Sequence, residues 1–342
     1  MTSGPVASRS LLVTGARGFL GSEIVKQAAS EGMYVRALDI KPSSEMPGVQ
    51  PVVADILDGD ALRKNMSGVD AVVHAAGWAH DFKPSAASAE RMNRLHIEGT
   101  RNVVAAAAES GVGAIVHISS VAVYGRAKSG ICSELTAPDP DGSYAESKLG
   151  AEGEATIVAA RWRMPLTILR LTTLYGEGDP GNLARLMRAI DRRRFLWIGD
   201  GSNVKCLLHV EDAARAVLGV VRRPEAGSQI FNVSAPPCPM REVIEHVALS
   251  LGRSVPPMFL GRPAALSAVK WATRVAGGCP SLRPMTRTLE KFLASDRVSG
   301  EAFERAYGFE AQIPLREGLR REAEWYRRSL GREPAPKDPE PR

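Results

Sequence analysis

Short, almost wholly apolar runs alternate with longer amphipathic stretches through the first half of the chain. The stretches at 19–32, 99–111 and 144–162 have helical spacing, and the runs between them resemble strands buried on both faces. Strands that alternate with helices predict a parallel, doubly wound sheet with right-handed crossovers, an α/β fold. Six strands are expected, at 10–16, 33–40, 49–56, 70–77, 114–120 and 165–171.

The alternation stops after Leu171. Turns and one helix follow, then two strand-like runs around a helix, then a proline-rich and helical remainder with no clear strand. This change predicts a sheet domain, a smaller and mostly helical lobe, and a disordered tail of proline and charged residues. The expected division is 1–171 and 204–234 for the sheet domain, 172–203 and 235–330 for the lobe, and 331–342 for the tail.

The composition is that of a globular protein: 342 residues, 44% hydrophobic and 24% charged, with a net charge of +6. The mild excess of positive charge suits a doubly negative ligand such as a nucleotide. The basic runs at 192–194 and 327–328 have no interleaved aromatic residues, so we interpret them as solvated helix faces and expect no nucleic-acid partner.

Cysteine and histidine spacing predicts neither disulfides nor a metal site. The four cysteines form no C-x-x-C pair, and the six histidines lack zinc-ligand spacing, which favours a reducing compartment. The N-terminus lacks a signal-peptide pattern, and no apolar run reaches the roughly 18 residues needed to span a bilayer. A cytoplasmic protein without membrane contact is expected.

The segment TGARGFLG joins the first predicted strand to the first helix. Gly15, Gly18 and Gly21 allow a tight turn, close approach to a pyrophosphate, and packing of helix on strand. The helix N-terminus adds free N–H groups and a positive dipole end for the anion. Because the triplet lies in a strand–turn–helix context, it predicts a Rossmann-type dinucleotide site in the sheet domain.

Asp39 ends the second strand, 18 residues after Gly21. An acid at about this distance binds the adenosine ribose hydroxyls and repels a 2′-phosphate, which favours NAD over NADP. Arg17, Arg36 and Lys41 lie near in sequence and would act in the opposite direction.

Tyr144 and Lys148 stand one helical turn apart, and a serine at the end of the fifth strand emerges at the ligand-binding edge of the sheet. Hydride transfer from an alcohol needs a base, and a tyrosine with a pKa of about 10 would need it lowered by about 3, or roughly 4 kcal/mol. A nearby lysine and a positive nicotinamide act in that direction. The alternative is an ordinary surface pair.

The stretches TGARGFLG, HISSVAVYG, YAESK and GDGSNVKCLLHVEDAARA resemble the extended short-chain dehydrogenase/reductase family, and within it the nucleotide-sugar epimerase/dehydratase branch. The likeness covers residues 9 to 235 well. It implies that Ser120, Tyr144 and Lys148 are catalytic. It also implies a set of cofactor-binding residues, which includes the glycine loop: Gly15, Arg17, Gly18, Phe19, Leu20, Gly21, Asp39, Asp55, Ile56, Ala75, Ala76, Gly77, Tyr144 and Lys148. The substrate-binding residues that it implies are Ser119, Ser120, Thr173, Asn182, Leu183 and Lys205.

The sequence departs from the family pattern at three places. His96 stands where an asparagine is usual, Lys205 replaces an arginine that binds the sugar nucleotide, and a late R-x-G-D element is not evident. Asn182 is also open to another interpretation, as a helix cap after Gly181.

Dehydratases and decarboxylases of this branch carry acids just after the catalytic serine or threonine, whereas this chain has Val121 and Ala122. Hydride transfer at one carbon remains, and the preference for NAD favours a UDP-sugar 4-epimerase. A nucleotide-4-keto-sugar reductase that uses NAD(P)H and a hydroxysteroid-dehydrogenase-like enzyme stay open, and a non-catalytic dinucleotide sensor is disfavoured because the tyrosine and lysine are both present. The resemblance also implies a homodimer formed through the helices at 99–111 and 144–162.

Overall fold

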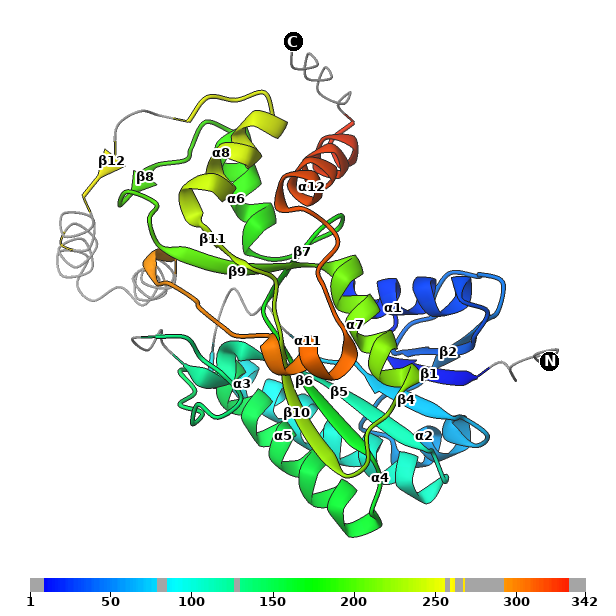
Figure 1. The fold of residues 1–342 in the computed structure, drawn as a ribbon. Helices are drawn as coiled ribbons and strands as arrows, with labels where there is room; N and C mark the ends of the chain where they lie inside the picture. The colour runs from blue at the N-terminus through cyan, green and yellow to red at the C-terminus, as the bar shows by residue number, and fades with distance from the viewer. Residues whose placement is uncertain are drawn as a thin grey trace, which may run out of the picture.

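The largest element is a seven-stranded sheet in which neighbouring strands run parallel, in the order β10-β6-β5-β4-β1-β2-β3 (Figure 1). The computed structural model describes residues 9–78, 85–125, 130–255, 259–261, 267 and 292–331. All six predicted strands are present, and a seventh extends one edge. The strands are β1 (Ser10–Thr14), β2 (Tyr34–Asp39), β3 (Val49–Val53), β4 (Ala71–His74), β5 (Ala114–Ser120), β6 (Leu166–Leu171) and β10 (Ser228–Val233).

Helices cover both faces of this sheet, which confirms the doubly wound fold. Alternate residues of β1 face opposite sides, so Leu11 and Val13 join one buried cluster and Leu12 joins the other. The first cluster includes residues of α1 (Phe19–Ser30), α7 (Val210–Arg222) and α11 (Glu301–Tyr307), and the second includes residues of α2 (Gly59–Met66), α4 (Gly99–Glu109) and α5 (Ser143–Trp162).

The strand order reverses between β1 and β4, which pair side by side. In open parallel sheets a ligand binds outside the carboxyl ends of the strands at such a reversal. The loops after β1, β2, β4 and β5 therefore meet at one crevice. Between β4 and α4 lie α3 (Ala86–Asn93) and the π-helical segment η1 (Arg94–Glu98), and the short 3₁₀ segment η2 (Val121–Tyr124) follows β5.

A second group of elements lies beyond this edge (Figure 1). Three helices surround a buried cluster that includes Tyr175, Trp197 and Leu207. The sequence predicted no strand after residue 235, yet two short strands form there. One of them is an edge strand that contains two prolines, which a sheet edge tolerates. The helices are α6 (Asn182–Asp191), α8 (Met240–Ser250) and α12 (Leu315–Ser329), and the strands are β7 (Thr173–Tyr175), β8 (Trp197–Ile198), β9 (Val204–His209), β11 (Pro237–Pro239) and β12 (Phe259–Leu260).

The division of the chain into two units stays a prediction. Within the predicted sheet domain, β9 pairs with β7 and β11 in a separate three-stranded sheet and leads directly into α7, so it connects the two groups. The predicted tail lies outside the described residues, apart from Gly331. Across the described ranges, no helix combines the length and hydrophobicity needed to cross a membrane.

Candidate active site

The loop after β1 has a shape that only glycine permits. Gly15 has φ +67°, and a Cβ there would lie 2.6 Å from the Ala76 Cα. A Cβ on Gly21 would overlap the carbonyl oxygen of Gly15, so α1 could not pack this close to the loop. Gly18 caps α1 without a side-chain hydrogen bond, which leaves the first-turn N–H groups at Phe19 and Leu20 available to an anion.

Asp39 lies against this loop. Its Oδ2 accepts a hydrogen bond from the backbone N–H of Arg17 over 3.0 Å. Arg36 is directed elsewhere, because its Nη1 donates to the carbonyl oxygens of Asn65 (2.8 Å) and Ser67 (2.7 Å) at the end of α2. Of the three cations that lie near Asp39 in sequence, Arg36 is therefore not available to bind a 2′-phosphate on the ribose.

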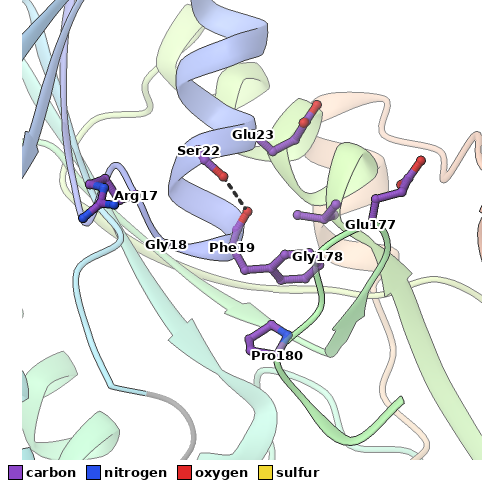
Figure 2. A pocket seen from close by; sticks show the side chains of 9 residues that line it. Arg17, Gly18, Phe19, Ser22, Glu23, Glu177, Gly178 and Pro180 are labelled. Atoms are coloured by element: carbon purple, nitrogen blue, oxygen red, sulfur yellow. Dashed lines mark hydrogen bonds between the residues drawn. The ribbon is translucent and has the colours of Figure 1, made fainter. Parts of the chain in front are cut away.

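A pocket of about 450 Å³ lies between the start of α1 and the loop after β7. Figure 2 shows the Phe19 ring directed toward Gly178 and Pro180, and the Arg17 side chain directed away from them. Burial by itself would raise the pKa of Glu177 at this pocket, but the nearby His209 ring, a backbone hydrogen bond and the ion pair with Arg321 (2.8 Å) outweigh it and hold the pKa at about 2. A fixed negative charge therefore lies across the pocket from the glycine loop.

The predicted cofactor-binding residues that follow β3 and β4 lie at the same edge of the sheet. The Asp55 carboxylate accepts the N–H of Leu57 (2.9 Å), while Ile56 is buried and its carbonyl accepts from Asn102 Nδ2 (3.2 Å). Ala75 and Ala76 follow β4 directly, and the Ala76 N–H donates to Thr14 Oγ1 over 3.2 Å. The ends of β1 and β4 are thus held together around Gly15.

Ser120, Tyr144 and Lys148 converge at this edge. Ser120 ends β5, Tyr144 lies in the first turn of α5, and the Ser120 hydroxyl is near enough to affect the pKa of Tyr144. The Lys148 side chain is buried, and its Nζ donates to the carbonyl oxygen of Ile118 over 2.8 Å. Burial lowers the pKa of Lys148 to about 8, and the negative charge of Glu152 opposes this change.

The direction of the Tyr144 pKa differs from the sequence expectation. Burial raises the pKa of Tyr144 above its ordinary value, and the nearby Ser120 hydroxyl only partly opposes this. The Lys148 ammonium is bound to the Ile118 carbonyl. The lowering that a base requires is therefore not provided by the protein groups alone.

Comparison with known proteins now identifies the family. The model of the NAD dependent epimerase/dehydratase family matches residues 11–234. The chain belongs to this family, within the extended short-chain dehydrogenases/reductases. The N-acetyl-alpha-D-glucosaminyl-diphospho-ditrans,octacis-undecaprenol 4-epimerase of Escherichia coli O157:H7 is 31% identical over 264 residues, which are 75% of this chain and 76% of that protein.

Two further similarities extend beyond the matched region. The 2-alkyl-3-oxoalkanoate reductase of Stenotrophomonas maltophilia is 28% identical over 337 residues, 91% of this chain and 97% of that protein. The solved structure of MoeE5 in complex with UDP-glucuronic acid and NAD superposes with a TM-score of 0.76 at 28% identity, covering 94% of this chain and all of that one.

Behind the crevice of this family member lies a buried ionic network that sequence reasoning missed. Glu152 follows Lys148 by one helical turn and accepts hydrogen bonds from Arg170 Nη2 (2.6 Å) and Ser119 Oγ (2.5 Å). Arg170 also donates to the Tyr124 hydroxyl over 2.9 Å. The position of Glu152 one helical turn after Lys148, in the spacing Y-x-x-x-K-x-x-x-E, was the sequence signal for its place on the same helix face. Ser119, predicted to bind substrate, is thus buried and directed into this network instead of the crevice.

The remaining predicted substrate residues fall into two groups. Thr173 and Asn182 are exposed at the starts of β7 and α6. Asn182 does not cap α6, because the N-cap is Gly181 and the carboxylate of Asp179 accepts the Gly181 N–H (2.7 Å). Leu183, however, is buried in the helical cluster, and Lys205 Nζ pairs with Asp296 Oδ2 over 2.7 Å.

Proposed function

We propose that this chain is an NAD-dependent epimerase of a nucleotide sugar, of the UDP-sugar 4-epimerase type, that acts through a transient 4-keto intermediate. The observation that carries the proposal is the convergence of Ser120, Tyr144 and Lys148 beside the glycine loop, with no carboxylate at the two positions after the serine. The similarity to the 4-epimerase of Escherichia coli O157:H7, at 31% identity, supports the same reaction class.

The residues around the glycine loop fit NAD. The uncapped first turn of α1 would bind the pyrophosphate, and Asp39 would bind the adenosine ribose hydroxyls. Phe19, Leu20, Asp55, Ile56 and the Ala75–Gly77 stretch are proposed to line the dinucleotide. When bound, NAD supplies the acceptor for the hydride of the sugar carbon and a positive charge near the reacting oxygen.

The chain's own residues handle the proton. Tyr144 would accept the proton of the sugar hydroxyl, and the Lys148 ammonium would stabilise the tyrosinate that results. The Ser120 hydroxyl would donate a hydrogen bond to the sugar oxygen as it becomes a carbonyl. The ketone would then take the hydride back on its other face and the proton back from Tyr144, so no second acid is needed.

Dehydration requires acid–base groups that this site lacks at the positions after Ser120. Val121 and Ala122 form the start of η2, and neither side chain can transfer a proton. Thr173 and Asn182 are proposed to contact the nucleotide-sugar from the helical group. The predicted role of Lys205 requires its ion pair with Asp296 to open, and Leu183 would contribute through packing.

The test is incubation of the protein, with its nucleotide content measured, with UDP-glucose, UDP-galactose and their N-acetyl forms. Interconversion at C4, followed by proton NMR, is expected without consumption of added cofactor. Tyr144→Phe should abolish interconversion and leave NAD affinity within about threefold, because the substitution removes only the hydroxyl. Absence of interconversion for all four sugars by NAD-loaded protein would reject the epimerase.

A reductase is the second candidate. The similarity to the Stenotrophomonas maltophilia oxoalkanoate reductase extends over 91% of this chain, whereas the epimerase family model ends at residue 234. A 4-keto-sugar reductase or a hydroxysteroid-dehydrogenase-like enzyme would use the same triad but consume one NADH or NADPH per turnover. Stoichiometric loss of absorbance at 340 nm with a keto substrate would identify it.

A homodimer through α4 and α5 is proposed as well. The two helices pack against each other, and α5 exposes Ile157 (60%) and Trp162 (50%). A monomeric mass of the full chain by light scattering at micromolar concentration would contradict this assembly. Cytoplasmic location stays a prediction from the sequence.

A further inference from the structure

His96 lies at the centre of η1, a π-helical segment between α3 and α4. Single π-helical turns are uncommon inside helices and are often found at functional sites. The residue is 2% exposed, and the sequence already marked it as a departure from the family's asparagine. Its contacts reach two elements of the candidate active site.

The hydrogen bonds of His96 define its tautomer. The backbone N–H of Trp78 donates to His96 Nε2 over 2.8 Å, so Nε2 carries no proton. The Ser147 hydroxyl donates to the carbonyl oxygen of Tyr144 over 2.9 Å, so its oxygen accepts from His96 Nδ1 over 2.8 Å. Burial and the nearby charge of Lys148 lower the pKa of His96 to about 2, which keeps the ring neutral.

This chain of bonds connects the loop after β4 with the first turn of α5. A Cβ on Gly77 would lie 3.0 Å from His96 Nε2 and 3.6 Å from Lys148 Nζ, so these groups meet at Gly77. The His96 and Tyr144 rings are 6.0 Å apart, edge to face. The N-cap of α5 is Gly142, which has no side chain to cap the first-turn N–H groups, so the bonds of Ser147 and His96 add a restraint that the cap does not supply.

We infer that His96 is a positioning residue for proton transfer: as a neutral Nδ1–H imidazole, it holds the turn of α5 that carries Tyr144 in register with the loop that carries Gly77. This inference rests on the proposed role of Tyr144. Because a misplacement of about 1 Å can cost about 100-fold in rate, loss of the bonds should lower kcat more than it lowers affinity.

The first test is independent of the reaction. In protein labelled with ¹⁵N-histidine, the resonances absent from His96→Gln belong to His96. They should show a protonated Nδ1 and an unprotonated Nε2, unchanged from pH 5 to pH 8. A protonated Nε2, or titration within that range, would overturn the inference whatever reaction the enzyme performs.

The second test uses a double-mutant cycle. His96→Leu and Ser147→Ala should each lower kcat at least about tenfold, with KM and the NAD dissociation constant within about threefold. The double variant should be no worse than the worse single variant, because both interrupt one chain of bonds. His96→Gln, which offers one donor and one acceptor, should recover kcat to within about threefold of wild type.

Thr156→Ala is the matched control. Its hydroxyl donates to the Glu152 carbonyl (2.8 Å) on the same helix without a contact to His96, so its kcat should stay within about twofold of wild type. Unchanged kcat in His96→Leu or in Ser147→Ala, or additive losses in the cycle, would refute the positioning role. Activity retained by Tyr144→Phe would instead refute the proposed function and leave the tautomer assignment in place.

Discussion

Arg170 and Glu152 form a bidentate ion pair in the buried layer behind Lys148, with Arg170 Nη2 2.6 Å from Glu152 Oε2 and Arg170 Nε 3.0 Å from Glu152 Oε1. Both side chains are almost fully buried, with 5% and 4% exposed. The pair joins β6 to α5 one helical turn beyond the predicted catalytic lysine. The same carboxylate opposes the loss of the lysine's charge, so it affects both stability and chemistry.

Arg170→Met should therefore lower the free energy of unfolding by about 3–5 kcal/mol, because it leaves the Glu152 carboxylate buried without its counter-ion. The matched control is Arg101→Met, which breaks an ion pair with Glu154 between the exposed parts of α4 and α5 (2.8 Å) and should cost less than about 1 kcal/mol. Urea unfolding of both variants measures the difference. Equal losses would contradict the importance assigned to the buried pair.

Glu322→Gln should alter the pH dependence of stability. Burial, and secondly the charge of Asp179, raises the pKa of Glu322 to about 9. Protonated Glu322 stabilises the folded protein. This stabilisation is fully present below pH 4.5, the pKa of the group in the unfolded chain, and is lost as the pH rises through the folded pKa of about 9. Between these values the wild type should lose about 1.4 kcal/mol per pH unit from this group, and the glutamine variant should not.

The measurement is the free energy of unfolding of wild type and Glu322→Gln at pH 5.5, 7 and 8.5. The other titrating groups are common to both proteins, so the difference between the two curves isolates residue 322. The Glu322 Oε2 atom accepts the Gly176 N–H over 3.1 Å, and the amide oxygen of glutamine can keep this bond. Parallel curves would show that Glu322 is ionised in the folded protein.

Asp39→Asn should weaken the discrimination against NADP. The amide oxygen can still accept the Arg17 N–H, so the loop should keep its shape while the charge that repels a 2′-phosphate is lost. The ratio of NADP to NAD dissociation constants should fall at least about tenfold, a change of about 1.4 kcal/mol, measured by calorimetry. Asp70→Asn, at the opposite ends of β1 and β4, should leave the ratio unchanged.

Gly21→Ala should abolish NAD binding or folding, because its Cβ would overlap the Gly15 carbonyl oxygen. Gly219→Ala makes the same chemical change on α7, away from the proposed dimer helices, where no atom outside the adjacent residues and the helix's own backbone lies within 4 Å of the added Cβ. It should raise the unfolding free energy by up to about 1 kcal/mol, since alanine favours a helix. Thermal unfolding with and without NAD separates the two outcomes, and tolerance of Gly21→Ala would disprove the close packing of α1 on the loop.

Local patterns predicted the parts of the site whose geometry is local. The glycine loop depends on a positive φ at Gly15 and on the contact of α1 with its own loop, and both follow from one short segment. Tyr144 and Lys148 share a helix face because they are one turn apart. The interpretation of Asn182 as the cap of α6 was wrong, because the Asp179 carboxylate accepts the N–H groups of Gly181 and Ala184 at the start of this helix.

The sequence by itself determined the doubly wound sheet, the phosphate-binding turn and the spacing of the tyrosine and lysine, because apolar periodicity and glycine conformations act over a few residues. Only the tertiary structure decided that burial raises the Tyr144 pKa, that Ser119 turns inward to Glu152, and that Lys205 pairs with Asp296. It also brought His96 to Ser147, 51 positions along the chain. Desolvation and hydrogen-bond partners are contributed by segments distant in sequence, so no local pattern contains them.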